Sequence, residues 1–234
     1  MKRIGHKGAD HITPGNTLDS FDAALAAGVD MVEFDVLPEH PDGSGRLILA
    51  HDYADAARRT PITLEQGLEH FRQDAWAGVE LAVDMKLAGY ERRVVDALGT
   101  AGLSQRALIS TMEEQSLPIV RLAGPEVRLA WSVPKVRRNY LSHPATRLPA
   151  LAAARYGRRV MPGRVARAIH DGRVDAIMAH WALVSAALVQ AVAGAGGELY
   201  VWTVDDRERI AWLEDLGVTG VISNDPRLFA AAAA

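Results

Sequence analysis

The chain has 234 residues, of which 49% are hydrophobic and 24% are charged, and its 26 Lys and Arg residues nearly balance its 29 Asp and Glu residues. This composition excludes a disordered, collagen-like or coiled-coil protein. The longest apolar runs fall well short of the roughly 20 residues that a membrane-spanning helix needs, and the first residues lack the apolar core of a signal peptide. We therefore expect a cytoplasmic protein, with residues 1–234 forming one domain.

Short apolar runs alternate with segments of helical periodicity along the chain, a pattern typical of a parallel α/β sheet. The predicted strands cover residues 3–5, 31–36, 80–85, 107–111, 127–132, 174–179, 199–204 and 220–223. The predicted helices cover residues 18–27, 64–71, 90–100, 115–122, 165–170, 183–193 and 206–216. Eight strands that alternate with helices in a chain of this length predict a (β/α)8 TIM barrel with little or no insertion domain. An extra strand at residues 46–50 follows a turn at residues 41–43, and we expect it to return beside the second barrel strand.

Three carboxylates lie in predicted strands, where a barrel interior would favour apolar side chains. Glu33 and Asp35 are two residues apart and therefore lie on one face of their strand, and Asp84 shares a face with Lys86 in the next. Carboxylates this close repel each other unless a cation binds, one is protonated, or a basic residue intervenes. With no Cys in the chain, the set suits a hard divalent cation such as Mg2+ or Ca2+. Amide capping by Glu33 and Asp35, and internal pairing of Asp84 with Lys86, remain alternatives.

Two histidines end predicted strands beside these carboxylates. His6 ends the first barrel strand, and His51 ends the extra strand. Imidazole titrates near neutral pH, so two of them at one site can supply a general base and a general acid. His180 and Trp202 also fall near strand ends. The indole is expected either to form a wall of a substrate pocket or to belong to the core.

Residues 127–170 hold ten Lys or Arg residues and no Asp or Glu. We interpret this segment as a solvated face or as a surface for weak contact with an anionic membrane. Nucleic acid is not an expected partner, because the chain as a whole is mildly acidic and this segment has few aromatic residues. The sequence also lacks the glycine-rich nucleotide motifs and the nucleophile elbow of serine hydrolases.

Eight motifs resemble, in order and along nearly the whole chain, those of the glycerophosphodiester phosphodiesterase family. They are His6-Lys7-Gly8, Pro14-Gly15-Asn16-Thr17, Glu33-Phe34-Asp35-Val36, His51-Asp52, Arg59-Thr60, Asp84-x-Lys86, Trp202-Thr203-Val204 and Asn224-Asp225-Pro226. The resemblance implies a barrel of the phospholipase-C-like phosphodiesterase type that hydrolyses a glycerophosphodiester to glycerol 3-phosphate and an alcohol. The residues it implies are Glu33, Asp35 and Asp84 as ligands of a divalent cation, His6 and His51 as the acid–base pair, and Lys7, Lys86 and Trp202 around the substrate.

The sequence departs from this family at three points. Lys7 stands where Arg is usual, so a bidentate phosphate contact becomes a point-charge contact, and Gly15 stands where Glu is usual. Only 32 residues separate His51 from Asp84, so the insertion that many members carry there is largely missing.

These departures keep two alternatives open. The related sphingomyelinase D-type phospholipases also lack the insertion, which leaves a lysophospholipid substrate as one alternative. A barrel that binds phosphodiesters without turning them over is the other, although binding alone would need no acid–base pair.

Overall fold

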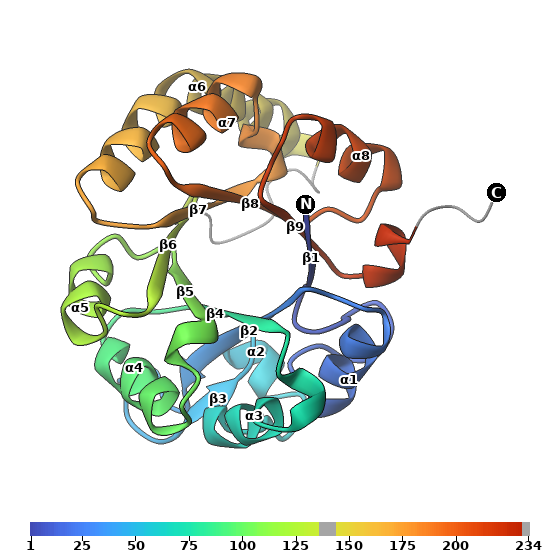
Figure 1. Cartoon of the computed structure of the whole chain (residues 1–234), viewed down its shortest axis with the longest axis vertical. Coiled ribbons are helices and arrows are strands. Elements are labelled where there is room, and N and C mark those ends of the chain that lie inside the picture. The colour runs from blue at the N-terminus through green and yellow to red at the C-terminus, as the bar shows by residue number, and fades with distance from the viewer. Residues whose placement is uncertain (136–143, 231–234) are drawn as a thin grey trace.

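A closed barrel of eight parallel strands forms the centre of the computed structural model, which describes residues 1–135 and 144–230 (Figure 1). The strands follow one another around the ring as β1 (Lys2–Gly5), β2 (Met31–Pro38), β4 (Glu80–Met85), β5 (Ala107–Thr111), β6 (Arg128–Val133), β7 (Ala176–His180), β8 (Glu198–Trp202) and β9 (Gly220–Ser223). β1 pairs with both β9 and β2 and so closes the ring. The extra strand, β3 (Leu47–Leu49), runs antiparallel to β2 outside it. The predicted barrel and the returning strand are both confirmed.

Helices surround the barrel on its outer side (Figure 1). They are α1 (Leu18–Ala26), α2 (Tyr53–Ala56), α3 (Leu64–Phe71), α4 (Glu91–Thr100), α5 (Leu117–Ala123), α6 (Pro144–His170), α7 (Ala186–Gly194) and α8 (Arg207–Asp215), with short 3-10 turns η1 (Asp74–Trp76), η2 (Ser104–Arg106), η3 (Trp181–Leu183) and η4 (Pro226–Phe229). None of the helices in the described residues is long and apolar enough to cross a membrane.

The prediction of a short helix at residues 165–170 was wrong, because α6 is 27 residues long and begins at Pro144. Pro149 and Pro162 lie inside this helix, and proline normally ends or kinks a helix, which concealed the longer element. Much of the basic segment lies on α6, where Arg155, Arg159 and Arg167 are exposed. Residues 136–143, with two more of its arginines, lie outside the described part.

Side chains fill the barrel interior in layers, as expected for this fold. The middle of the interior is apolar and contains Ile4, Met31, Ala82, Leu108, Ala130, Ala176, Met178, Tyr200 and Ile222, with Trp202 packed against them. Residues two positions earlier and two positions later on the same strands also point inward. The layer toward the amino ends of the strands and the layer toward their carboxyl ends both carry charged side chains.

The outer face of β2 is anchored by aromatic packing. Phe34 stacks on Phe71 of α3 with ring centroids 5.3 Å apart, and Phe21 of α1 packs 4.9 Å from Phe71. All three rings are fully buried. Because neighbouring residues of a strand point to opposite faces, burying Phe34 outward directs Glu33 and Asp35 into the barrel.

Candidate active site

Three carboxylates meet at the carboxyl-end opening of the barrel. Glu33 and Asp35 come from β2 and Asp84 comes from β4, and one oxygen of each lies within 4.8 Å of the others. The register that pairs Asp35 with Asp84 across neighbouring strands brings the third carboxylate to the other two. We call these three residues the carboxylate cluster. Its hard oxygen donors fit a divalent cation such as Mg2+ or Ca2+.

Lys86 bridges two members of the carboxylate cluster. Its Nζ donates to Asp35 Oδ1 at 3.0 Å and to Asp84 Oδ2 at 2.9 Å. The Ser110 hydroxyl donates to the other oxygen of Asp84 at 2.7 Å. Burial opposes the charged form of Lys86, but the nearby carboxylates raise its pKa well above the ordinary value. The predicted pairing of Asp84 with Lys86 therefore exists, but Lys86 also bonds Asp35.

Asp35 is held by a pair of hydrogen bonds to Asn16. The Asn16 amide Nδ2 donates to Asp35 Oδ2 at 2.8 Å, and the Asp35 backbone N–H donates to Asn16 Oδ1 at 3.0 Å. Both residues are buried. Burial alone would raise the pKa of Asp35, but the positive charge of Lys86 holds it well below the ordinary value. Asp35 is therefore a fixed, ionised carboxylate.

Glu33 has fewer compensating contacts than Asp35. Its Oε2 accepts a hydrogen bond of 2.8 Å from the Lys7 backbone N–H, and His6 Nε2 lies 3.8 Å from the same oxygen. Burial raises the pKa of Glu33 well above its ordinary value, and the charges of Asp35 and Asp84 raise it further. A divalent cation would supply the positive charge that this carboxylate needs to remain ionised, so the site fits such an ion.

His6 is oriented by a chain of hydrogen bonds from residues that follow β9 and β8. His6 Nδ1 lies 2.5 Å from Asn224 Oδ1, while Asn224 Nδ2 donates to Asp205 Oδ2 at 2.6 Å. The Asp205 carboxylate can only accept, which fixes the Asn224 amide with its oxygen toward His6. His6 Nδ1 therefore carries the proton, and Nε2 faces Glu33 with its lone pair free. Burial lowers the pKa of His6 and favours this neutral form.

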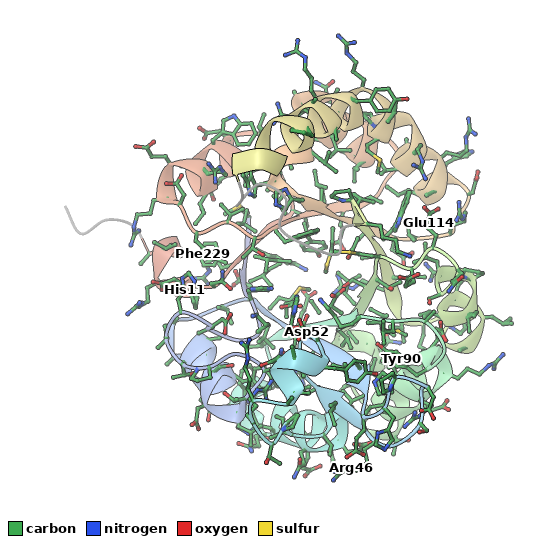
Figure 2. The ribbon with its side chains drawn as sticks, turned by 180° about the vertical axis from the view of Figure 1, so that it is seen from behind. His11, Arg46, Asp52, Tyr90, Glu114 and Phe229 are labelled. Carbon is green, nitrogen blue, oxygen red and sulfur yellow. The ribbon has the colours of Figure 1, made fainter. Side chains whose placement is uncertain are left out.

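His51 follows β3 and lies at the edge of the same opening. Its side chain is half exposed, and its Nδ1 lies 3.2 Å from Asp52 Oδ2. Figure 2, which views the barrel from the side opposite to Figure 1, shows Asp52 on the inner edge of the ring. His51 lines a hollow together with Lys7, Asp52, Ala54, Asp55 and Arg58.

Arg59 secures this edge of the site. Its guanidinium donates to Leu49 O at 2.9 Å and to Asp55 Oδ2 at 3.0 Å. Asp55 in turn accepts from the His51 backbone N–H at 3.1 Å. The end of β3, helix α2 and the backbone of His51 are thus tied together.

Trp202 caps the apolar interior next to the site. Its Nε1 donates to Met178 O at 3.0 Å, and its ring meets His180 edge to face at a centroid distance of 5.0 Å. Burial, with the charge of Arg209, lowers the pKa of His180 to about 4. His180 is thus a neutral packing partner of the indole, which is partly buried and lies above the apolar interior.

Sequence reasoning missed the supporting residues of the site. Asn16 and Asn224 were identified only as members of family-like motifs and given no role in the site, although each fixes an ionisable side chain, and Asp205 and Ser110 were not identified at all. Asn224 comes directly after a barrel strand, as His6 does, and this position could have identified it from the sequence. The contact of Asn16 with Asp35 depends on the path of a loop, which the spacing of residues does not show.

Known proteins share both the sequence pattern and the fold. The model of the glycerophosphoryl diester phosphodiesterase family matches residues 6–62 and 62–228. YhdW of Bacillus subtilis (strain 168), a candidate glycerophosphodiester phosphodiesterase, is 23% identical over an alignment of 254 positions. The alignment covers 97% of this chain and 95% of that protein.

Solved structures show the same fold at lower identity. A glycerophosphodiester phosphodiesterase of Agrobacterium tumefaciens is similar with a TM-score of 0.69 and 19% identity, covering 99% of this chain and 100% of that one. An Oleispira antarctica phosphodiesterase, solved with the product sn-glycerol-3-phosphate, has a TM-score of 0.68 and 19% identity, covering 97% and 94%. The family model spans the chain from His6, just after β1, to Leu228, and includes the carboxylate cluster and both histidines. The chain therefore belongs to the glycerophosphoryl diester phosphodiesterase family and is a phosphodiesterase.

Proposed function

We propose that this phosphodiesterase hydrolyses glycerophosphodiesters to glycerol 3-phosphate and an alcohol, and that it depends on Mg2+ or Ca2+ held by Glu33, Asp35 and Asp84. The observation that carries the proposal is the carboxylate cluster lying beside His6, whose free Nε2 faces Glu33 at 3.8 Å. The product bound to the Oleispira antarctica structure supports the choice of substrate class.

A divalent cation in the carboxylate cluster would polarise a phosphoryl oxygen and neutralise charge as the diester reacts. The cluster would hold the ion with its carboxylate oxygens. Asn16 and Ser110 keep Asp35 and Asp84 in place through their hydrogen bonds.

The two histidines divide the proton transfers between them. His6 is the general base, because its Nδ1–H is engaged by Asn224 and its Nε2 is free to accept a proton from the nucleophile. His51 is the general acid for the leaving alkoxide. It lies at the exposed edge of the opening, and the Asp52 carboxylate, 3.2 Å from its Nδ1, orients the imidazole.

Two lysines and an indole surround the place of the substrate. Lys86 remains an ammonium beside the carboxylate cluster, and Lys7 lines the hollow that contains His51. We assign both lysines to the phosphate, where each acts as a point charge. Trp202 closes the floor of the opening above the apolar interior.

Product analysis tests this function. The purified chain is incubated with a panel of glycerophosphodiesters and lysophospholipids in Mg2+, Ca2+ or chelator, and the products are identified by 31P NMR. Glycerol 3-phosphate that forms only with a divalent cation, and that His51→Ala largely abolishes, supports the proposal. Tight binding of the cation without any product would favour the non-catalytic alternative.

A lysophospholipid substrate is the second candidate, and the exposed face of α6 favours it. Arg155, Tyr156 and Arg159 are exposed near its middle, and Arg158 donates to the carbonyl oxygen of Ala182 just beyond the carboxyl end of β7. This places Arg158 on the same side of the barrel as the site, where an anionic membrane surface would attract it and its basic neighbours. Cyclic or lyso-phosphate products, together with salt-sensitive binding to anionic vesicles, would support this reading over the first.

A further inference from the structure

Asp10 occupies the space beside Gly15 and binds the side chain of Lys7. Asp10 Oδ2 lies 2.6 Å from Lys7 Nζ, and Asp10 Oδ1 accepts a hydrogen bond of 2.8 Å from the Gly15 amide. A Cβ atom on Gly15 would lie 2.6 Å from Asp10 Oδ1 and 2.7 Å from Lys7 Cβ. Any side chain at position 15 would therefore displace either the Asp10 carboxylate or Lys7.

The backbone of Lys7 is already fixed at both of its polar groups. Its N–H donates to Glu33 Oε2 at 2.8 Å, and its C=O accepts from Asn16 N at 2.9 Å and from the Ser20 hydroxyl at 2.6 Å. Lys7 has a φ of 50°, a left-handed conformation that costs energy for a residue with a Cβ and persists where surrounding contacts enforce it. The contact with Asp10 fixes the remaining flexible part of the residue, its side-chain end.

A lysine that is held before the substrate arrives has an advantage over a free one. A free lysine loses rotamer freedom when it binds a phosphate. The contact with Asp10 already restricts the rotamers of Lys7 before a substrate binds. An ammonium has three N–H donors, so the contact with Asp10 leaves donors for a phosphate oxygen. Lys7 also lines the hollow that contains His51, which is where such an oxygen would have to lie.

We propose that Asp10 is a positioning residue for phosphate binding, which holds the Lys7 ammonium at the carboxyl-end opening, and that the missing side chain of Gly15 makes room for it. This inference rests on the proposed function, because it assigns Lys7 to the substrate phosphate. It adds a carboxylate that contacts neither the carboxylate cluster nor the acid–base pair.

The variant Asp10→Asn separates positioning from simple charge competition. Asparagine has nearly the same shape and keeps an acceptor for the Gly15 amide, but it loses the ion pair with Lys7. Positioning predicts that KM rises about threefold to tenfold while kcat changes less than about twofold. A carboxylate that merely competes with phosphate for Lys7 predicts the opposite, a lower KM. An unchanged or lower KM would overturn the proposal.

A double-mutant cycle with Lys7→Met tests whether Asp10 acts through Lys7. If it does, Asp10→Asn raises KM in the wild-type background and does not raise it in the Lys7→Met background. An equal rise in both backgrounds would overturn the proposal. Glu69→Gln is the matched control, because it removes the same charge from an exposed pair with Arg72, just after α3, and should leave KM unchanged.

Binding of inorganic phosphate, measured by calorimetry in Mg2+, provides a readout that needs no turnover. Weaker binding by Asp10→Asn and by Gly15→Ala, with thermal unfolding close to that of the wild type, is the expected result. Equal binding by all the proteins, or no binding by the wild type, would overturn the inference. Failure of the wild type to release glycerol 3-phosphate would instead count against the proposed function, so the two failures are distinguishable.

Discussion

Charged side chains line both ends of the barrel interior, but they are balanced at one end and unbalanced at the other. At the amino end, an ion-paired layer consists of Lys2, Glu80, Arg128 and Glu198. Lys2 Nζ lies 2.6 Å from Glu80 Oε1, and Arg128 bonds both Glu80 and Glu198, the latter at 3.2 Å. At the carboxyl end, three carboxylates converge and Lys86 bonds two of them. Charged side chains inside this barrel therefore indicate a functional site at the carboxyl end, where opposite charges do not neutralise them.

Two glutamates illustrate this difference. Burial would raise the pKa of Glu80, but hydrogen bonds from Lys2 and Arg128 lower it below the ordinary value. Burial does raise the pKa of Glu33, and the neighbouring carboxylates raise it further. The ion-paired layer therefore stabilises the fold by itself, whereas the carboxylate cluster awaits a positive charge from outside the chain.

The largest effect is expected for Asp35→Asn at the unbalanced end. The variant keeps a side chain of the same shape but removes an ionised ligand, so we expect kcat/KM to fall about a thousandfold or more and the affinity for Mg2+ to fall with it. Steady-state kinetics and calorimetry measure the two quantities. Loss of activity with unchanged affinity for the ion would contradict the assignment of Asp35 as a ligand.

A smaller loss is expected for His6→Ala, because it removes the base and leaves the carboxylate cluster in place. We expect kcat to fall about a hundredfold to a thousandfold, with binding of Mg2+ retained. The comparison with Asp35→Asn then separates proton transfer from ion binding. An activity near that of the wild type would refute the role of His6 as the base.

A still smaller loss is expected for Asn224→Ala, since Asn224 acts on the reaction through His6. Without the acceptor for His6 Nδ1–H, the imidazole loses its fixed orientation, and we expect kcat/KM to fall about tenfold. The same substitution should have no further effect in the His6→Ala background. An undiminished effect in that background would show that Asn224 acts elsewhere.

The smallest effect on activity is expected for Glu80→Gln in the ion-paired layer. It leaves Lys2 and Arg128 without their shared carboxylate, so we expect the free energy of unfolding to fall by about 1–3 kcal/mol at pH 7, with kcat/KM within about twofold of the wild type. Because the folded-state pKa of Glu80 is lowered, its contribution is present above the unfolded-state pKa near 4.3 and is lost as the pH falls through the folded-state value. Denaturant unfolding of both proteins between pH 7 and pH 3 should therefore converge.

The barrel and the main ionisable residues of the site were predictable from local patterns. The two-residue spacing of Glu33 and Asp35 fixes a shared face whatever the surrounding fold. The bridge from Lys86 to Asp35 depends on the register of β2 against β4, and the contact of His6 with Asn224 joins the first strand to the last. Neither is visible in a local pattern. The space that Asp10 takes beside Gly15 likewise exists only in three dimensions.

The most direct test measures the release of glycerol 3-phosphate by the wild type, Asp35→Asn and Glu80→Gln, each with Mg2+ and with excess chelator. Both substitutions convert an interior carboxylate to an amide, at opposite ends of the same barrel. We predict that the wild type and Glu80→Gln release product with Mg2+ and lose this activity in chelator, and that Asp35→Asn is inactive in both. Full activity of the wild type in chelator, or full activity of Asp35→Asn, would contradict the account.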